Sequence, residues 1–261
     1  MLITIAPDRE ALGRAAANRI AGFLRQALAG QEYANLLLST GMSQFETLDA
    51  LAAHKLDWHR VNMFHLDEYV NLPVTHKASF RKYLKERVLS RIPLREAHLI
   101  DGEKPQETLD ALNALMIKTA IDVGVIGIGE NAHIAFNDPP ANFTRRDAFH
   151  IVQLDQACKQ QQVNEGWFES LADVPDSAIS ITPRRIMACR HIVSPVPDAR
   201  KAEAIRATMM AVHDDPMVPA SLLKNHPSWH LFVDAGSFRL CAPGLIMPGT
   251  TREPAIRHEG G

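Results

Sequence analysis

Segments typical of β-strands alternate with segments typical of α-helices along most of this 261-residue chain. A strand–helix–strand order requires crossover connections, which are characteristic of parallel sheets. We therefore expect an α/β fold, a mainly parallel, doubly wound, Rossmann-like sheet with helices on both faces. The predicted strands are residues 2–5, 34–39, 60–66, 98–100, 121–126, 178–181, 191–194 and 230–233. The predicted helices are residues 8–28, 44–53, 79–89, 105–118 and 200–211.

Composition supports one domain over residues 1–261, because 46% of the residues are hydrophobic and can build a sizeable core. Two segments depart from this pattern. Residues 139–173 show no clear periodicity, and we expect a mobile flap there. We expect residues 250–261 to form a frayed tail.

Charge and cysteine usage exclude several classes of protein. The 28 basic and 30 acidic residues nearly balance and form no basic run, which argues against a nucleic-acid partner. Three cysteines, Cys158, Cys189 and Cys241, lie too far apart for a zinc ribbon and are odd in number for a disulfide framework. No signal peptide and no run of about 18 apolar residues are present. We therefore expect a cytoplasmic protein that binds a small molecule and no membrane.

Residues 127–140 follow a predicted buried strand and carry the strongest chemical signal in the chain. The strand ends in a glycine turn, after which come Asn131, His133 and Asp138. Strand ends that turn through glycine are where open α/β sheets build active sites. The imidazole has an unperturbed pKa near neutral pH, so His133 is a candidate proton carrier.

A second predicted strand ends in a small polar turn that opens a helix: Ser39, Thr40, Gly41, Met42 and Ser43. Amides at a helix start, flanked by hydroxyl groups, suit a phosphate. Ordinary helix capping by serine or threonine explains the same residues without a ligand, and no Walker lysine pattern is present.

Two further segments carry charged groups near strand ends. Asp67 and Glu68 follow the third predicted strand. Adjacent carboxylates point in different directions, so we expect at most one of them to face a cleft and act as a general base. The alternative is that both carboxylates are solvated on a loop. Lys201 lies in the first turn of a predicted helix, where the helix dipole favours anions rather than cations. It is a candidate anion ligand, or else part of a solvated basic face.

Taken together, these segments resemble the glucosamine-6-phosphate deaminase (isomerase) family. The resemblance covers most of the chain in the right order. The most specific evidence for the resemblance is that two motifs occur together at matching positions: His-Ile-Ala-Phe-Asn at residues 133–137 and Asp-Glu-Tyr at residues 67–69. Residues 38–44 resemble the family's phosphate loop, Lys201 its phosphate-binding lysine, and residues 219–223 with 226–227 its closing helix.

The resemblance implies a cofactor-free, metal-free enzyme that converts a hexosamine 6-phosphate, foremost glucosamine 6-phosphate, and water to fructose 6-phosphate and ammonia. His133 would open the pyranose ring, and Asp67 would move a proton from C2 to C1 through an enolamine. Asp138 would fix the imidazole tautomer. Thr40, Gly41, Ser43 and Lys201 would hold the phosphate. Relatives range from monomers to hexamers, so a homo-oligomer is compatible with the resemblance.

Three positions of the catalytic loop depart from the family pattern. Asn131 stands where aspartate is usual, Ala132 where glycine is usual, and Asp138 where glutamate is usual. A second phosphate-binding arginine of the family falls among residues 160–162, all glutamine here, with Lys159 as the candidate substitute. The identity of the amino sugar, glucosamine or galactosamine, stays open.

Three alternatives compete with a deaminating isomerase. A 6-phosphogluconolactonase shares the fold. In that family, however, Gly-His is typically followed by Thr-Ala-Ser-Leu-Phe, whereas His133 of this chain is followed by Ile-Ala-Phe-Asn. A non-catalytic sugar-phosphate sensor would carry an amino-terminal winged helix, and we expect no room for one before the first predicted strand. Such sensors also tend to lose the acid–base pair, whereas Asp67 and His133 are both present. A degenerate, inactive homologue is the third alternative, and it rests on Asn131.

Overall fold

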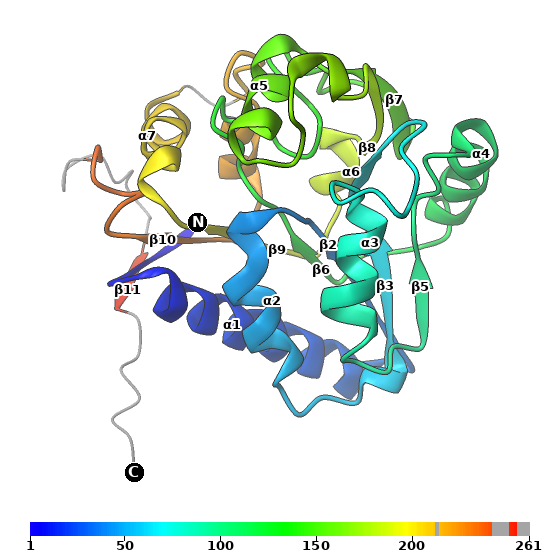
Figure 1. The fold of residues 1–261 in the computed structure, drawn as a ribbon. Helices are drawn as coiled ribbons and strands as arrows, with labels where there is room; N and C mark the ends of the chain where they lie inside the picture. Colours follow the sequence, from blue (N-terminus) through cyan, green and yellow to red (C-terminus); the bar gives the residue numbers. More distant parts are fainter. Residues whose placement is uncertain (212–213, 242–250, 255–261) are drawn as a thin grey trace.

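The computed structural model describes residues 1–211, 214–241 and 251–254, and its centre is a parallel sheet of eight strands. The spatial order is β11-β1-β10-β9-β6-β2-β3-β5 (Figure 1). The strands are β1 (Leu2–Ala6), β2 (Ala34–Leu38), β3 (Val61–His65), β5 (Glu96–His98), β6 (Val123–Val125), β9 (His191–Val196), β10 (Trp229–Asp234) and β11 (Thr251–Pro254).

Helices cover both faces of this sheet, which confirms the predicted α/β fold class. One hydrophobic cluster packs α1, α2, α3 and the π-helical turn η3 against the sheet, and a second packs α4, α6, α7 and the 3₁₀ helix η6 against it. Strand β2 shows the consequence, because all five of its residues are buried, as expected for a parallel strand covered on both sides. The bounds are α1 (Arg9–Gly30), α2 (Phe45–Ala52), α3 (Phe80–Leu84), η3 (Lys85–Leu89), α4 (Pro105–Met116), α6 (Pro183–Ile186), α7 (Ala202–Met210) and η6 (Pro219–Asn225).

A second, antiparallel sheet of three strands was not predicted. It consists of β4 (Asp67–Tyr69), β8 (Ser177–Ile181) and β7 (Phe149–Gln153), in that spatial order. In Figure 1 it lies with helix α5 (Gln156–Asn164) above the main sheet, on the opposite side from α1. The second sheet escaped prediction because β4 has only three residues, two of them acidic, and is stabilised by long-range pairing with β8.

Two predictions about irregular segments need correction. Residues 139–173, predicted as an irregular, mobile flap, contain the strand β7 and the helix α5, and their mobility stays a prediction. The predicted tail is wrong for residues 251–254, which pair parallel with β1 as β11; residues 250 and 255–261 lie outside the described residues. The short predicted strand at residues 98–100 lies slightly earlier, at β5.

The chain order places a topological switch point between β2 and β6. From β2 the chain runs outward to β3 and β5, and it then returns to β6 on the other side of β2. In doubly wound sheets, ligands bind outside the carboxyl ends of the strands at such a point. The loop after β2 and the loop after β6 meet there, and the Ser39 amide donates to the Val125 carbonyl at 3.0 Å.

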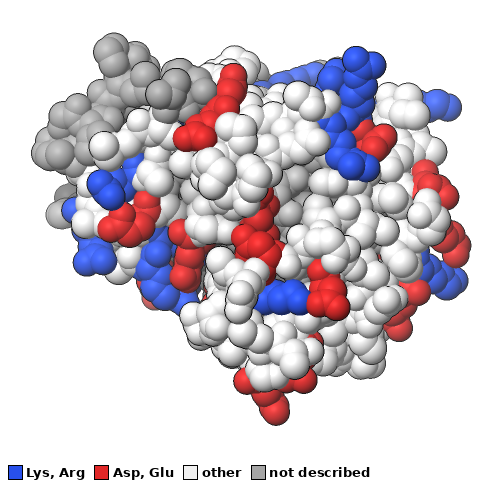
Figure 2. All heavy atoms as spheres, turned by 90° about the horizontal axis from the view of Figure 1, so that it is seen from above, with Lys and Arg blue, Asp and Glu red and all other residues white. Residues whose placement is uncertain are grey.

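The face in Figure 2, seen from above, interleaves Lys and Arg with Asp and Glu and shows no broad area of a single sign. None of the described helices is long and apolar enough to cross a membrane.

Candidate active site

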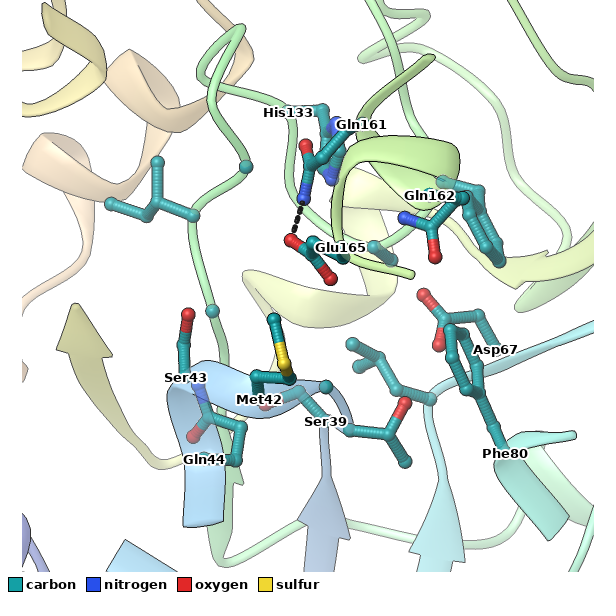
Figure 3. Close-up of a pocket in the computed structure, with 18 of the residues that line it drawn as sticks. Ser39, Met42, Ser43, Gln44, Asp67, Phe80, His133, Gln161, Gln162 and Glu165 are labelled. Carbon is teal, nitrogen blue, oxygen red and sulfur yellow. Dashed lines mark hydrogen bonds between the residues drawn. The ribbon is translucent and has the colours of Figure 1, made fainter. Parts of the chain in front are cut away.

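A pocket opens at the carboxyl ends of β2, β3 and β6, at the switch point (Figure 3). Six parts of the chain that are distant in sequence supply its wall: the loop after β2, the end of β3 with β4, Phe80 at the start of α3, the loop after β6, the α5 region, and Lys201 after β9. It is lined by Ser39, Thr40, Gly41, Met42, Ser43, Gln44, Leu66, Asp67, Phe80, Gly127, Ile128, Gly129, His133, Ala135, Phe136, Gln161, Gln162, Glu165, Trp167 and Lys201.

The loop after β2 presents the small polar residues singled out in the sequence. Ser39, Thr40, Gly41, Met42 and Ser43 all line the pocket. Gly41 has φ +99°, which requires glycine, and its carbonyl accepts a hydrogen bond from the Tyr83 hydroxyl at 3.1 Å. Within the described part of the chain, the buried Ser39 hydroxyl has no hydrogen-bond partner. The loop is therefore fixed by its own contacts and keeps an unsatisfied hydroxyl beside the pocket.

The two adjacent carboxylates after β3 take different roles. Glu68 is fully buried and accepts hydrogen bonds from the Ser79 hydroxyl and from the amides of Phe80 and Arg81, so it caps the start of α3. Asp67 is also buried, but its side chain faces the pocket (Figure 3). The alternative of a solvated pair is wrong, because both side chains are withdrawn from solvent.

The carboxyl group of Asp67 is tuned for proton transfer near neutral pH. Burial and the nearby Glu68 charge raise its pKa to about 8. A base with a pKa close to the working pH can both take and return a proton. A cation bound in the pocket would favour the ionised form of Asp67.

His133 reaches the pocket from the loop after β6 and is backed by Asp138. The imidazole Nδ1 lies 3.0 Å from Asp138 Oδ1, which leaves Nε2 as the nitrogen available to a ligand. Burial raises the pKa of Asp138, but the contacts with His133 and with the Asn131 amide outweigh burial and hold this pKa below its usual value. An ionised carboxylate behind the ring orients the ring and stabilises its charged form.

Asn131 contacts Asp138 and the backbone of His133. Its side-chain amide donates to Asp138 Oδ1 at 3.0 Å, and its carbonyl accepts from the His133 backbone amide at 3.1 Å. Neither Asn131 nor Asp138 lines the pocket, so both lie behind His133. Ala132, where glycine is usual, has φ +65°, the left-handed conformation that glycine adopts at lower cost.

Lys201 is a buried lysine that lines the pocket. Its residue is only 3% exposed, and among the residues that the structure describes its ammonium has no hydrogen-bond or ion-pair partner. Burial lowers the pKa of Lys201, and the carboxylates of Glu165 and Glu130 partly offset this effect. Since an unpaired buried charge is costly, the arrangement favours an anion beside Lys201.

Helix α5 supplies a wall of the pocket that the sequence did not reveal. Gln161, Gln162 and Glu165 line the pocket, and the Gln161 side chain donates to Glu165 at 2.8 Å (Figure 3). Helix α5 escaped prediction because its sequence, Gln156–Asn164, has almost no apolar periodicity; the three glutamines were the one visible signal. Lys159 pairs with Asp176 and does not line the pocket, so it does not replace the missing arginine.

Comparison with known proteins agrees with this geometry. A family model described as glucosamine-6-phosphate isomerases/6-phosphogluconolactonase matches residues 7–231. A glucosamine-6-phosphate deaminase of Exiguobacterium sp. is 31% identical over 246 residues, covering 92% of this chain and 93% of the relative. One of Bacillus cytotoxicus is 30% identical over 210 residues, covering 80% of this chain and 78% of the relative.

Solved structures share the fold at lower identity. A monomeric glucosamine-6-phosphate deaminase superposes with a TM-score of 0.81 at 24% identity, covering 92% of this chain and all of that one. A 6-phosphogluconolactonase from Trypanosoma brucei superposes with a TM-score of 0.76 at 15% identity, covering 92% of this chain and 98% of that one. The chain therefore belongs to the family of glucosamine-6-phosphate isomerases and 6-phosphogluconolactonases.

Proposed function

We propose that this protein is a glucosamine-6-phosphate deaminase, which converts the amino-sugar phosphate and water to fructose 6-phosphate and ammonia. The observation that carries the proposal is the meeting of Asp67, His133 and Lys201 in one pocket, although they come from three different strand ends. The two relatives described above, which are 31% and 30% identical to this chain over most of its length, are named glucosamine-6-phosphate deaminase. We expect the protein to act in the cytoplasm as a single domain.

The pocket supports a sequence of proton transfers that needs no reactant other than water. Lys201 and the loop at residues 39–43 hold the phosphate. His133 takes the proton from the anomeric hydroxyl and gives it to the ring oxygen, which breaks the C1–O5 bond and exposes the aldehyde. Asp67 then removes the C2 proton and returns it to C1 through an enolamine, leaving an imine at C2. Water adds to this imine, and ammonia leaves to give the ketone.

The substrate's amine matches the electrostatics of the pocket. Asp67 and Glu165 both line it, and Asp67 must be ionised to act as a base. A substrate ammonium beside C2 would lower the raised pKa of Asp67 and so promote its ionisation. A lactone has no such cation, and its hydrolysis needs no proton abstraction from C2, which favours the deaminase over the lactonase.

The direct test is to incubate the protein with glucosamine 6-phosphate and, separately, galactosamine 6-phosphate, and to measure ammonia and ketose phosphate. A parallel reaction with 6-phosphogluconolactone tests the second activity of the family. Ammonia from glucosamine 6-phosphate supports the proposal. Lactone hydrolysis without ammonia from either amino sugar would overturn it, and no turnover of any of the three would support an inactive homologue.

Replacing Lys201 by alanine should mainly weaken substrate binding. The variant removes the buried cation that we assign to the phosphate, and a charge-assisted hydrogen bond to a phosphate contributes about 2 kcal/mol, so KM should rise roughly 30-fold with a smaller change in kcat. Steady-state kinetics with glucosamine 6-phosphate check this result. Lys159→Ala is the matched control, because Lys159 pairs with Asp176 outside the pocket. Equal KM values for the two variants would contradict the assignment.

Gly129→Ala should lower activity by displacing His133. A Cβ at this position would overlap the imidazole ring, and a displacement of about 1 Å can cost on the order of 100-fold in rate. We expect the loss in kcat, with the protein still folded by circular dichroism. Gly22→Ala is the control, since a Cβ on Gly22 meets nothing within 4 Å. An active Gly129→Ala enzyme would show that the close approach of Gly129 to the ring is dispensable.

A further inference from the structure

We infer that His133, Asp138 and Cys158 form a zinc-binding site, and that zinc bound there inhibits the enzyme. The imidazole nitrogen, a carboxylate oxygen and the thiol sulfur all lie within 4.8 Å of one another. The inhibitory part of this inference rests on the proposed function, whereas metal binding does not. The proton transfers proposed above are carried by Asp67 and His133, so this zinc would be a regulator and not a cofactor.

The three donors come from two elements that meet over the pocket. His133 and Asp138 belong to the loop after β6, and Cys158 is the third residue of α5. Its position is fixed at the start of the helix, where its amide donates to the Asp155 side chain at 2.6 Å. Cys158 is 1% exposed, and Asp138 has 9% of its side chain exposed. The donors thus converge on an enclosed point rather than on open surface.

Asp138 is the donor whose hydrogen bonding is incomplete. Its Oδ1 accepts from the Asn131 amide and lies 3.0 Å from His133 Nδ1, whereas its buried Oδ2 has no hydrogen-bond partner among the described residues. Buried polar atoms are nearly always satisfied in folded proteins, so this oxygen, in a cluster with an imidazole and a thiol, favours a ligand that the three side chains share. A cation would satisfy it.

The set of donors selects zinc among the common cations. Thiolate, imidazole and carboxylate are its usual ligands, whereas magnesium and calcium prefer oxygen alone. Around a tetrahedral zinc the ligand atoms lie about 3.5 Å apart, so a small movement of α5 towards the loop would complete the site. On binding, the Cys158 thiol releases its proton to solvent as the sulfur–zinc bond forms, and water takes the fourth position.

Zinc at this point would stop proton transfer by His133. The metal would occupy Nδ1 and withdraw Asp138 from the imidazole, so the ring would lose the carboxylate that orients and stabilises it. It would also tie α5, which supplies Gln161 and Gln162 to the pocket wall, to the loop after β6. Both effects predict a reversible loss of turnover.

Cobalt spectroscopy tests the site independently of turnover. Cobalt(II) chloride added to the purified protein should produce a thiolate-to-cobalt charge-transfer band in the near ultraviolet with one equivalent bound, and zinc chloride should abolish the band by displacement. Cys158→Ser and Cys158→Ala should both lose the band, whereas Cys241→Ser, which changes another buried free cysteine, should keep it. Absence of the band in the wild-type protein, or its persistence in both Cys158 variants, would overturn the site.

Activity measurements then test the consequence. Zinc chloride should inhibit ammonia release by the wild-type enzyme, EDTA should restore it, and Cys158→Ser should need at least tenfold more zinc for the same inhibition. Magnesium chloride should have no effect. If the cobalt band appears but zinc leaves turnover unchanged, the inhibitory role is refuted while the metal site stands. If the protein has no deaminase activity, the proposed function fails and the spectroscopic result still decides the site.

Discussion

Asp67→Asn should abolish deamination while leaving the substrate bound. The substitution keeps the shape of the side chain but removes the base, and general acid–base catalysis contributes roughly 10²–10⁴-fold, so we expect kcat to fall by about 10³-fold or more. The decisive measurement is exchange of the C2 proton of glucosamine 6-phosphate with deuterium oxide, followed by NMR. Affinity for the substrate, measured by calorimetry, is the control for an intact phosphate site. Wild-type exchange in the variant would remove Asp67 from the role of base.

The raised pKa of Asp67 also gives the wild-type enzyme a pH dependence. Because burial and Glu68 raise this pKa to about 8, the free enzyme holds the carboxyl largely protonated at pH 7, and kcat/KM should rise as the pH passes through about 8. Asp67→Asn should lack this rise in whatever activity remains. A wild-type profile that is flat between pH 6 and pH 9 would contradict the raised pKa.

The same substitution should stabilise the fold at neutral and alkaline pH. The folded protein holds a proton on Asp67 up to about pH 8, whereas the unfolded chain releases it above its model value of 3.8. The unfolded state therefore binds fewer protons in this range, and the free energy of unfolding falls as the pH rises from about 4 to about 8. Asparagine cannot ionise, so thermal melts of Asp67→Asn should show a higher Tm at pH 8 and a weaker decline with pH. Glu68→Gln is the contrasting variant, because it removes a carboxylate that accepts hydrogen bonds at the start of α3, and should lower Tm.

The main sheet was predictable from sequence because its strands are defined by local composition. Segments such as β2 (Ala34–Leu38) are continuous apolar runs, and helices such as α1 show clear helical spacing after a capping aspartate. The three-stranded sheet and α5 were not predictable in this way. Strand β4 depends on pairing with β8 more than 100 residues away, and α5 has almost no amphipathic pattern. Tertiary contacts decide both, and no local window contains them.

The residues of the candidate site likewise differ in whether they could be predicted from the sequence. Residues at the ends of predicted strands, Asp67 and His133 among them, could be proposed because a parallel sheet gathers such ends at one edge. Gln161, Gln162 and Glu165 could not, because their place in the pocket depends on α5 folding over that edge. The pairing of Asn131 with Asp138 was also hidden, since sequence distance alone does not say which partner an amide chooses.

His133→Gln should impair ring opening more than proton transfer at C2. Glutamine can hydrogen-bond the ring oxygen but cannot carry the proton, so kcat for glucosamine 6-phosphate should fall by about 10²-fold or more. An analogue that lacks both the 4- and the 5-hydroxyl can close neither a furanose nor a pyranose ring and therefore does not need this step. In the His133→Gln variant, Asp67 should still exchange the C2 proton of this analogue, at a rate within a few-fold of the wild-type enzyme. The comparison separates the two residues, because Asp67→Asn should stop exchange in both compounds. If His133→Gln slowed the analogue as much as the sugar, His133 would act at C2, and the division of labour between the loop after β6 and the end of β3 would be wrong.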